Sequence, residues 1–383
     1  MRVRYLLLDA GRVGGGVRAV VTQANALADT HEVELVSVYR SRRSCAFELD
    51  PRVRQRHLVD VRTPRLRRPV TGALSAWRSR YVPPDEGRAR RLSLATDVVL
   101  RRYLARFDGG VLFTNRPALN LLAARFGSPR VVRVGQDHMN LRSYRPGVSA
   151  AIATWYPRLD ALTVLTHADA ADYRELLGQD MRIDVIPNMT DVGTAEPAPL
   201  AEHTVIAAGR LGRQKGFDML IDAFARTVPD HPDWRLRIFG GGRLATELQN
   251  RVAERGMTGH IALPGRTSRL GEQMRNASVY ALSSRYEGLP MVLLEAMAYG
   301  VPAVAFDCHT GPADIVTDGV DGLLVPPRDV GALARAMARL MDDRELRRRY
   351  GAAAMTSVRR YDTARVSPLW RRLITELTYP DGR

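Results

Sequence analysis

Two glutamates stand in an otherwise apolar stretch of the chain. Residues 285–302 have the sequence RYEGLPMVLLEAMAYGVP, in which seven residues separate Glu287 from Glu295. A carboxylate in so apolar a segment costs several kcal/mol unless it is paired or hydrogen-bonded, so each glutamate needs a partner. The vicinal hydroxyls of a sugar suit this role, because a carboxylate accepts two O–H donors at once. The pattern therefore suggests a polar ligand at this stretch.

The elements around the glutamates place them at the end of a strand and in the following helix. We predict a strand at 276–284, a turn, and a helix that begins just after Pro290 and ends at Gly300. Glu287 then lies in the loop, and Glu295 lies within the helix as its single charge. The free N–H groups at the start of that helix would attract an anion such as a phosphate.

Lys215 is the one lysine among 57 basic residues. Every other cationic position is an arginine, so Lys215 marks a place where a compact ammonium is needed in place of a planar guanidinium. A biased codon composition could also leave a single lysine by chance. The sequence leaves both interpretations open.

The elements that must position these residues form two similar α/β units in series. The chain of 383 residues suggests two domains of roughly 150 to 200 residues each. Strands alternate with helical segments from residue 2 onward, a Pro-, Ala- and Thr-rich linker covers 188–203, and the alternation then restarts. We predict two Rossmann-like domains, 1–187 and 188–362, facing across a cleft, with the amphipathic helix of 363–383 returning to the first. Such folds bind ligands at the carboxyl ends of their strands.

The positive charge of the chain is concentrated in its first half. Fifteen arginines stand against five acidic residues between Arg40 and Arg91, among them Arg65, Arg67 and Arg68. One interpretation is a solvated surface, and the other is an anionic partner such as a membrane surface or a polyanionic polymer. Nucleic acid ranks lowest, since the segment shows no aromatic interleaving and no recognisable binding module.

Other features exclude several classes of protein. No apolar run approaches the roughly 20 residues that would span a bilayer, and the N-terminal YLLL is too short for a signal peptide, so we expect a soluble intracellular protein. Cys45 and Cys308 lie far apart without metal-ligand spacing, which argues against a zinc site or a disulfide framework.

Three sequence blocks together resemble a known family over most of the chain. The blocks are EGLPMVLLE, AAGRLGRQKGFDMLIDAF and AYGVPAVAFDCHTGPADIVTDGVDGLLVPPRD. In this order and spacing they closely resemble the retaining nucleotide-sugar glycosyltransferases of family 4, which have the GT-B fold. The E-x7-E spacing alone would be a weak signal.

The resemblance implies roles for the two glutamates. It places Glu287 beside the donor sugar, together with the backbone N–H groups of the following turn, and Gly288, Leu289 and Pro290 are assigned to donor binding. It places Glu295 on the ribose hydroxyls.

The resemblance also implies that Arg210 and Lys215 contact the diphosphate, and we assign Arg266 to the donor as well. Two cations and a helix N-terminus would stabilise the charge that develops on the departing nucleoside diphosphate. We therefore expect no cofactor beyond the nucleotide sugar and no metal.

In the N-terminal domain the resemblance assigns Gly15 and Gly16 to the donor, through the glycine loop after the first strand. A glycine cluster at this place is a tight turn about as often as a ligand cradle. The segment GQDHMN (135–140) follows a strand where family members place a histidine near the donor sugar. His138 is the catalytic candidate, with Asp137 as the alternative.

The resulting prediction is a retaining glycosyltransferase that moves a hexose or N-acetylhexosamine from a nucleotide diphosphate sugar, UDP-linked by preference. The departing phosphate would assist deprotonation of the acceptor. The segment GGGVRAVVTQANALA together with the HTGP block looks most like the branches that act on lipid-linked glycans or cell-wall polymers such as teichoic acids. We expect the enzyme in the cytoplasm, with peripheral contact at the inner membrane face. The alternatives are transfer to a natural product or peptide and a non-catalytic nucleotide-binding protein of the same fold.

Overall fold

The computed structural model describes residues 1–62, 73–190 and 196–379. The chain divides into two compact units. The first unit comprises Met1–Met189 with Thr363–Arg383, and the second comprises Thr190–Asp362. Arg65, Arg67 and Arg68 lie outside the described residues.

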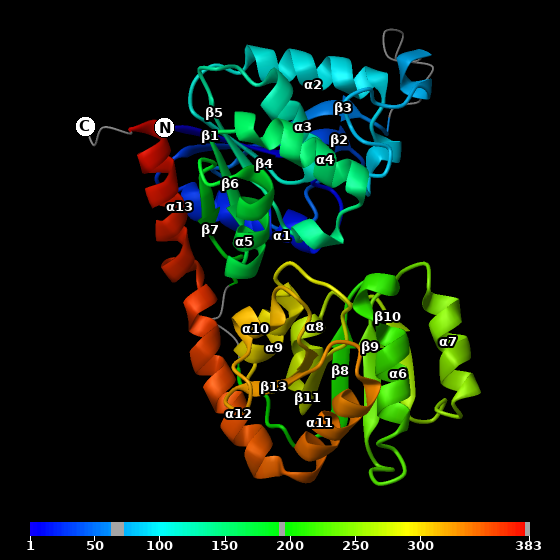
Figure 1. The fold of residues 1–383 in the computed structure, drawn as a ribbon. Coiled ribbons are helices and arrows are strands. Elements are labelled where there is room, and N and C mark those ends of the chain that lie inside the picture. The colour runs from blue at the N-terminus through cyan, green and yellow to red at the C-terminus, as the bar shows by residue number, and fades with distance from the viewer. Residues whose placement is uncertain (63–72, 191–195, 380–383) are drawn as a thin grey trace. The chain divides into compact units, whose positions relative to one another are not determined.

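The first unit contains a seven-stranded, wholly parallel sheet with strand order β3-β2-β1-β4-β5-β6-β7. Its strands are β1 (Arg2–Leu7), β2 (Glu32–Arg40), β3 (Arg54–Asp60), β4 (Val111–Thr114), β5 (Val132–Gln136), β6 (Ala161–Val164) and β7 (Ile183–Val185). Its helices are α1 (Gly15–Leu27), α2 (Leu94–Arg106), α3 (Pro117–Phe126), α4 (Pro146–Trp155), α5 (His167–Leu177) and α13 (Thr363–Thr378) (Figure 1).

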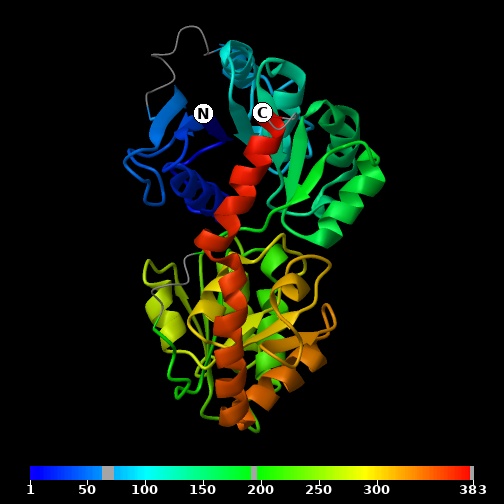
Figure 2. The ribbon, with the colours of Figure 1, turned by 90° about the vertical axis from the view of Figure 1, so that its left-hand side faces the viewer.

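Helices cover both faces of this sheet, because successive side chains of a strand point to opposite faces. In β1, Leu6 packs into one core with α2, α3, α4 and α5, whereas Tyr5 packs into the other with α1 and α13. Trp370 of α13 meets the ring of Phe113 edge-on, with ring centroids 5.6 Å apart. Figure 2 shows α13 from its exposed side. The C-terminal helix is therefore part of the core of the first unit.

One strand of this sheet was absent from the sequence prediction. The arginine-rich stretch forms β3, which pairs in parallel with β2 at the edge of the sheet. The apolar alternation that marks a strand is missing there, because its first three side chains, Arg54 to Arg56, are exposed. Arg54 pairs instead with Glu32 of the neighbouring strand, at 2.9 Å.

The second unit contains a six-stranded parallel sheet with strand order β10-β9-β8-β11-β12-β13. Its strands are β8 (Thr204–Ala208), β9 (Arg235–Phe239), β10 (Ile261–Gly265), β11 (Val279–Leu282), β12 (Ala303–Phe306) and β13 (Gly322–Val325). Its helices are α6 (Phe217–Ala225), α7 (Ala245–Glu254), α8 (Leu270–Arg275), α9 (Met291–Ala298), α10 (Pro312–Ile315), α11 (Val330–Asp342) and α12 (Arg344–Ser357).

Each sheet has a point where the strand order reverses, between β1 and β4 in the first unit and between β8 and β11 in the second. In open α/β sheets ligands bind outside the carboxyl ends of the strands at such a point. Both units are thus doubly wound α/β domains, as predicted. Within the described ranges, no helix combines the length and the apolar character needed to cross a bilayer.

Candidate active site

The candidate site of the second unit lies where its strand order reverses. Lys215 follows β8, and Glu287 follows the adjacent strand β11. The Lys215 Nζ donates to Glu287 Oε1 at 2.5 Å, and the two side chains are only 14% and 7% exposed. The fold therefore brings together a cation and a carboxylate that stand 72 positions apart in the sequence.

The backbone around Lys215 is fixed by a close approach to β11. Lys215 ends a short 3-10 helix, η6 (Arg213–Lys215), and Gly216 follows with φ 62°. A Cβ on Gly216 would stand 2.0 Å from the carbonyl oxygen of Ser283, so only glycine fits there. The Ser283 hydroxyl donates to the Lys215 carbonyl at 2.9 Å. The lysine is thus held by the strand that leads to Glu287.

Glu287 is fixed at both its side chain and its backbone. The Ser284 Oγ donates to Glu287 Oε1 at 2.5 Å, and the Thr310 Oγ1 donates to the Glu287 carbonyl at 2.5 Å. Glu287 is 6% exposed, and both hydroxyl-bearing residues are buried. These bonds supply part of the compensation that a buried carboxylate requires. Neither Ser284 nor Thr310 was predicted as a site residue.

A second set of contacts joins the two loops that carry the pair. The Arg285 N–H donates to the Gln214 carbonyl at 2.8 Å, and the Arg285 guanidinium forms a salt bridge with Asp218 of α6 at 2.5 Å. The Gln214 side chain donates to the Tyr286 carbonyl at 3.1 Å. Because these bonds cross between the loops, Lys215 and Glu287 are held on one rigid support.

Glu295 lies on α9 and is partly buried. Burial, with the charges of Glu287 and Glu295 as further causes, raises the pKa of the Tyr280 hydroxyl well above its ordinary value. Tyr280 thus lies near both carboxylates. Burial and the Glu287 charge likewise raise the pKa of the Cys308 thiol to about 12, which keeps it protonated at neutral pH and excludes it as a nucleophile.

The other predicted donor residues surround the loop after β8. Arg210 is exposed in that loop, whose next residue, Leu211, donates its N–H to the Gly241 carbonyl at 3.2 Å. Arg266 lies directly after β10 and packs on Gly241, where a Cβ would stand 2.7 Å from the Arg266 Nε. Gly288 lies in the turn that precedes α9. The loops after β8 and β10, two strands separated by β9, therefore carry arginine or lysine at the carboxyl ends of the sheet.

In the first unit, the glycine loop and His138 lie together. A Cβ on Gly16 would stand 3.8 Å from the Cβ of His138. Burial lowers the pKa of His138 below its ordinary value, against the opposing effects of the Asp137 charge and the nearby Asn188 side chain. The imidazole is therefore neutral at neutral pH, a state in which it can both donate and accept a hydrogen bond. Gly15 begins α1 beside it.

Asp137, the alternative to His138, is engaged inside the first unit. Its carboxylate accepts from Tyr144 at 2.6 Å, from the Met139 N–H at 2.9 Å and from the Tyr173 hydroxyl. The residue is 2% exposed. A carboxylate with three internal donors organises the loop after β5, so this geometry favours His138 as the ligand-facing residue. Burial and the Asp137 charge raise the pKa of the neighbouring Asp169 to about 8.

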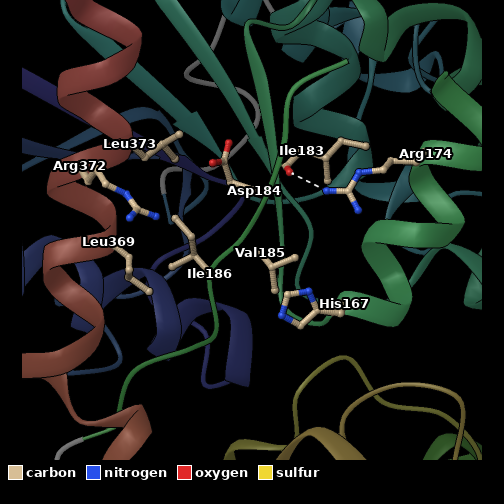
Figure 3. A pocket seen from close by; sticks show the side chains of 9 residues that line it. All are labelled: His167, Arg174, Ile183, Asp184, Val185, Ile186, Leu369, Arg372 and Leu373. Atoms are coloured by element: carbon tan, nitrogen blue, oxygen red, sulfur yellow. Dashed lines mark hydrogen bonds between the residues drawn. The ribbon is translucent and has the colours of Figure 1, made fainter. Parts of the chain in front are cut away.

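The first unit also has a pocket of about 240 Å³ beside the edge strand β7, between α5 and α13 (Figure 3). Its lining residues are His167, Arg174, Ile183, Asp184, Val185, Ile186, Leu369, Arg372 and Leu373. None of the predicted site residues lines it. The Arg174 guanidinium donates to the Ile183 carbonyl at 3.3 Å, and Asp184 pairs with Arg182 at 2.9 Å. These polar groups stabilise the free edge of the sheet.

The arginine-rich stretch is only partly neutralised. Five of its described arginines form salt bridges with carboxylates: Arg40, Arg52, Arg54, Arg62 and Arg91. Six exposed arginines of the same stretch form none with any described carboxylate: Arg42, Arg43, Arg56, Arg78, Arg80 and Arg90. The first unit therefore presents unpaired positive charge. Among the described residues, no group of three or more His, Cys, Asp or Glu side chains could hold a metal ion.

Comparison with known proteins identifies the family. The model described as "Glycosyl transferases group 1" matches residues 194–356. A phosphatidyl-myo-inositol mannosyltransferase of Mycobacterium leprae is 32% identical over 303 residues, which cover 76% of this chain and 79% of that protein. The chain belongs to the group 1 glycosyltransferases. The resemblance drawn from the sequence blocks is thereby confirmed.

Another relative and a solved structure extend the comparison. An exopolysaccharide phosphotransferase of Streptomyces coelicolor is 39% identical over 389 residues, which cover 98% of this chain but 41% of that protein, so the chain spans less than half of that relative. A mutant of S. aureus TarM, solved with fondaparinux, alpha-GlcNAc-glycerol and UDP, matches with a TM-score of 0.80 at 14% identity, covering 98% of this chain and 100% of that one. This likeness confirms the predicted GT-B fold.

Proposed function

We propose that the protein transfers a hexose or N-acetylhexosamine from a UDP-linked donor to a glycan or lipid-linked acceptor of the cell envelope, with retention at the anomeric carbon. The observation that carries the proposal is the Lys215–Glu287 pair where the strand order of the second unit reverses. UDP in the TarM complex supports the choice of nucleotide. Retention is supported by the resemblance of the sequence blocks to retaining enzymes.

The pair provides the electrostatics that the reaction needs. A lysine ammonium has three N–H donors, and Glu287 takes one of them in this structure. Among the described residues no other side chain accepts from Lys215, so the other two can face the donor diphosphate, and the N-terminus of α9 (Met291–Ala298) attracts the same anion. When the bond between the anomeric carbon and the phosphate oxygen breaks, negative charge develops on the diphosphate, and preorganised donors stabilise it. We propose that protein cations perform this task without a metal.

The remaining residues have binding roles in this proposal. Glu295 accepts the ribose hydroxyls, since a carboxylate accepts two O–H donors. Arg210 and Arg266 add positive charge around the diphosphate. In the first unit, His138 is assigned to the donor sugar and the backbone of Gly15 and Gly16 to donor binding. The acceptor hydroxyl attacks the anomeric carbon, and the departing phosphate oxygen takes its proton.

The acceptor class is supported by the named relatives and by the surface charge. Those relatives are a phosphatidyl-myo-inositol mannosyltransferase and an exopolysaccharide phosphotransferase. The unpaired arginines of the first unit suit an acceptor that carries phosphate or lies at an anionic membrane. Trp77, which is 68% exposed beside Arg78, is a side chain of the kind that is enriched at membrane interfaces. We propose peripheral contact with the inner face of the membrane.

A screen of nucleotide sugars tests the proposed activity. We expect UDP-sugars to raise the melting temperature, because a ligand that binds only the folded state stabilises it. We also expect slow hydrolysis, in which water replaces the acceptor and UDP is released. If no nucleotide sugar stabilises the protein or is hydrolysed, the proposal is wrong.

The role of the arginines is tested by binding to anionic vesicles. In the test variant Arg78, Arg80 and Arg90 are replaced by glutamine, and in the control variant Arg335, Arg339 and Arg344 of the second unit are replaced, with the same change in net charge. We expect the test variant alone to lose affinity, by about 1 kcal/mol per arginine at low salt, and salt to weaken wild-type binding because it screens exposed charges. Equal affinities of the two variants would identify the basic stretch as solvated surface.

A further inference from the structure

We propose that Ser284 is a positioning residue that holds the Glu287 carboxylate for catalysis, and that Thr310 holds the same residue through its backbone. This inference rests on the proposed function, because the reaction supplies its readout. Ser284 precedes the block EGLPMVLLE, and Thr310 lies within the third block, where the resemblance assigned no role to it. Both act on Glu287 from within the folded second unit.

Two donors converge on one oxygen of Glu287. The Lys215 Nζ and the Ser284 Oγ each lie 2.5 Å from Glu287 Oε1, and they arrive from different elements. Lys215 comes from the loop after β8, and Ser284 comes from the end of β11. Donors that arrive from two directions restrict the position of this oxygen more than either donor would alone. The Ser284 hydroxyl therefore helps to set where Oε1 lies.

The support of Ser284 is itself rigid. Ser284 is 2% exposed, and the next residue, Arg285, is bound through its N–H to the Gln214 carbonyl at 2.8 Å and through its side chain to Asp218. The short turn from Ser284 to Glu287 is thus pinned in its middle. The serine hydroxyl closes this turn by reaching the carboxylate three residues on.

Thr310 fixes the other end of the same turn. Its side chain is 1% exposed, and its Oγ1 donates to the Glu287 carbonyl at 2.5 Å. Gly311 follows with φ 98°, and a Cβ there would stand 2.6 Å from the Gly288 carbonyl oxygen. The loop after β12 therefore packs closely against the turn that carries Glu287. Serine, threonine and glycine together fix the backbone and the carboxylate of one residue.

Loss of the Ser284 hydroxyl should therefore displace the charged groups of Glu287 and Lys215 but leave both of them present. With Lys215 as its remaining donor from this pair, the carboxylate would follow the flexible lysine chain, and the ammonium would be displaced from the diphosphate in turn. A misplacement of about 1 Å in a catalytic group can reduce the rate about 100-fold. Donor binding, which depends mainly on other contacts, should change little.

The test measures donor hydrolysis and UDP affinity for wild type, Ser284→Ala and Ser284→Thr. We expect Ser284→Ala to lower kcat about 10- to 100-fold, with a smaller change in the Kd for UDP and with activity recovered in Ser284→Thr. Ser278→Ala is the matched control, because the Ser278 hydroxyl is equally buried and donates to the Glu202 carbonyl away from Glu287. This control should keep wild-type kcat.

A double variant separates positioning from general damage. In the Glu287→Ala background, Ser284→Ala should cause no further loss, because residues that act as one unit are not additive. Thr310→Val, which removes the other hydroxyl, should also lower kcat. It replaces Ser284→Ala as the test variant if Ser284→Ala does not fold. The inference is wrong if wild type hydrolyses the donor and both Ser284→Ala and Thr310→Val have the wild-type kcat. It is also wrong if Ser284→Ala lowers kcat further in the Glu287→Ala background. If wild type hydrolyses no nucleotide sugar, the proposed function fails and this inference fails with it.

Discussion

Replacing Lys215 by methionine should destabilise the second unit, because the Glu287 carboxylate would stay buried without its cation. The two side chains are 14% and 7% exposed, so solvent screens the pair only weakly. At an effective dielectric constant of about 20, unit charges about 4 Å apart interact by about 4 kcal/mol. Removing one partner of a buried pair costs about 3 to 5 kcal/mol. Because Ser284 still donates to the carboxylate, we expect a loss near the lower end, about 3 kcal/mol.

The companion change shows whether the loss comes from the unpaired charge. Replacing both residues, as Lys215→Met with Glu287→Gln, removes the buried carboxylate along with the ammonium. We expect the double variant to be more stable than the sum of the single losses predicts, with a coupling energy of about 2 kcal/mol. The surface pair Arg269–Glu272, at 3.5 Å with side chains 74% and 60% exposed, provides the control. Its coupling should be below about 0.5 kcal/mol.

Calorimetry of the four proteins of each cycle measures these energies, with urea unfolding as a second method. Because the chain has two units, the transition that UDP shifts to higher temperature is assigned to the second unit. A Lys215–Glu287 coupling as small as that of the surface pair would refute the argument that burial gives this contact its strength.

Three further predictions concern binding and pH. Glu295→Ala should weaken UDP binding while retaining most of kcat, whereas Lys215→Ala should lower kcat about 100- to 1000-fold, as steady-state hydrolysis measures. Burial lowers the pKa of His231, but its bond to Asp342 raises it overall. The stabilisation is thus present at low pH and lost as pH rises through the raised value, so His231→Gln should cost about 0.2 to 1 kcal/mol at pH 5.5 and less at pH 8.5. Burial raises the pKa of Asp169 to about 8, so wild type loses stability as pH rises toward that value, and Asp169→Asn should gain on wild type between pH 5 and pH 8.5 in urea unfolding.

The fold could be predicted because its signals are local. Strand and helix periodicities alternate along the chain, and this alternation alone indicates parallel sheets. The helix after Pro290 was predicted from its proline and its terminal glycine, and it spans Met291–Ala298. Strand β3 was not predicted, because its arginines lie at an exposed edge, where the apolar pattern of a strand is absent.

The candidate site could be predicted only in part, because its contacts join distant segments. The sequence showed that Glu287 and Lys215 needed explanation, yet nothing in a single sequence indicates that they touch across 72 positions. Ser284 and Thr310 went unnoticed, since a serine or threonine after a strand usually caps a turn. These contacts form because the strands that precede the loops are adjacent in the parallel sheet. Strand order is a long-range property, so local sequence patterns do not reveal it.

The role of Glu287 is tested most directly by comparing the release of UDP from a UDP-sugar by wild type, Glu287→Ala and the control Ser278→Ala. We expect wild type and Ser278→Ala to release UDP at similar rates, and Glu287→Ala to be at least about 100-fold slower while still binding UDP. Release of UDP by Glu287→Ala as fast as by wild type would contradict this role, because the reaction would then proceed without the carboxylate around which the site is built.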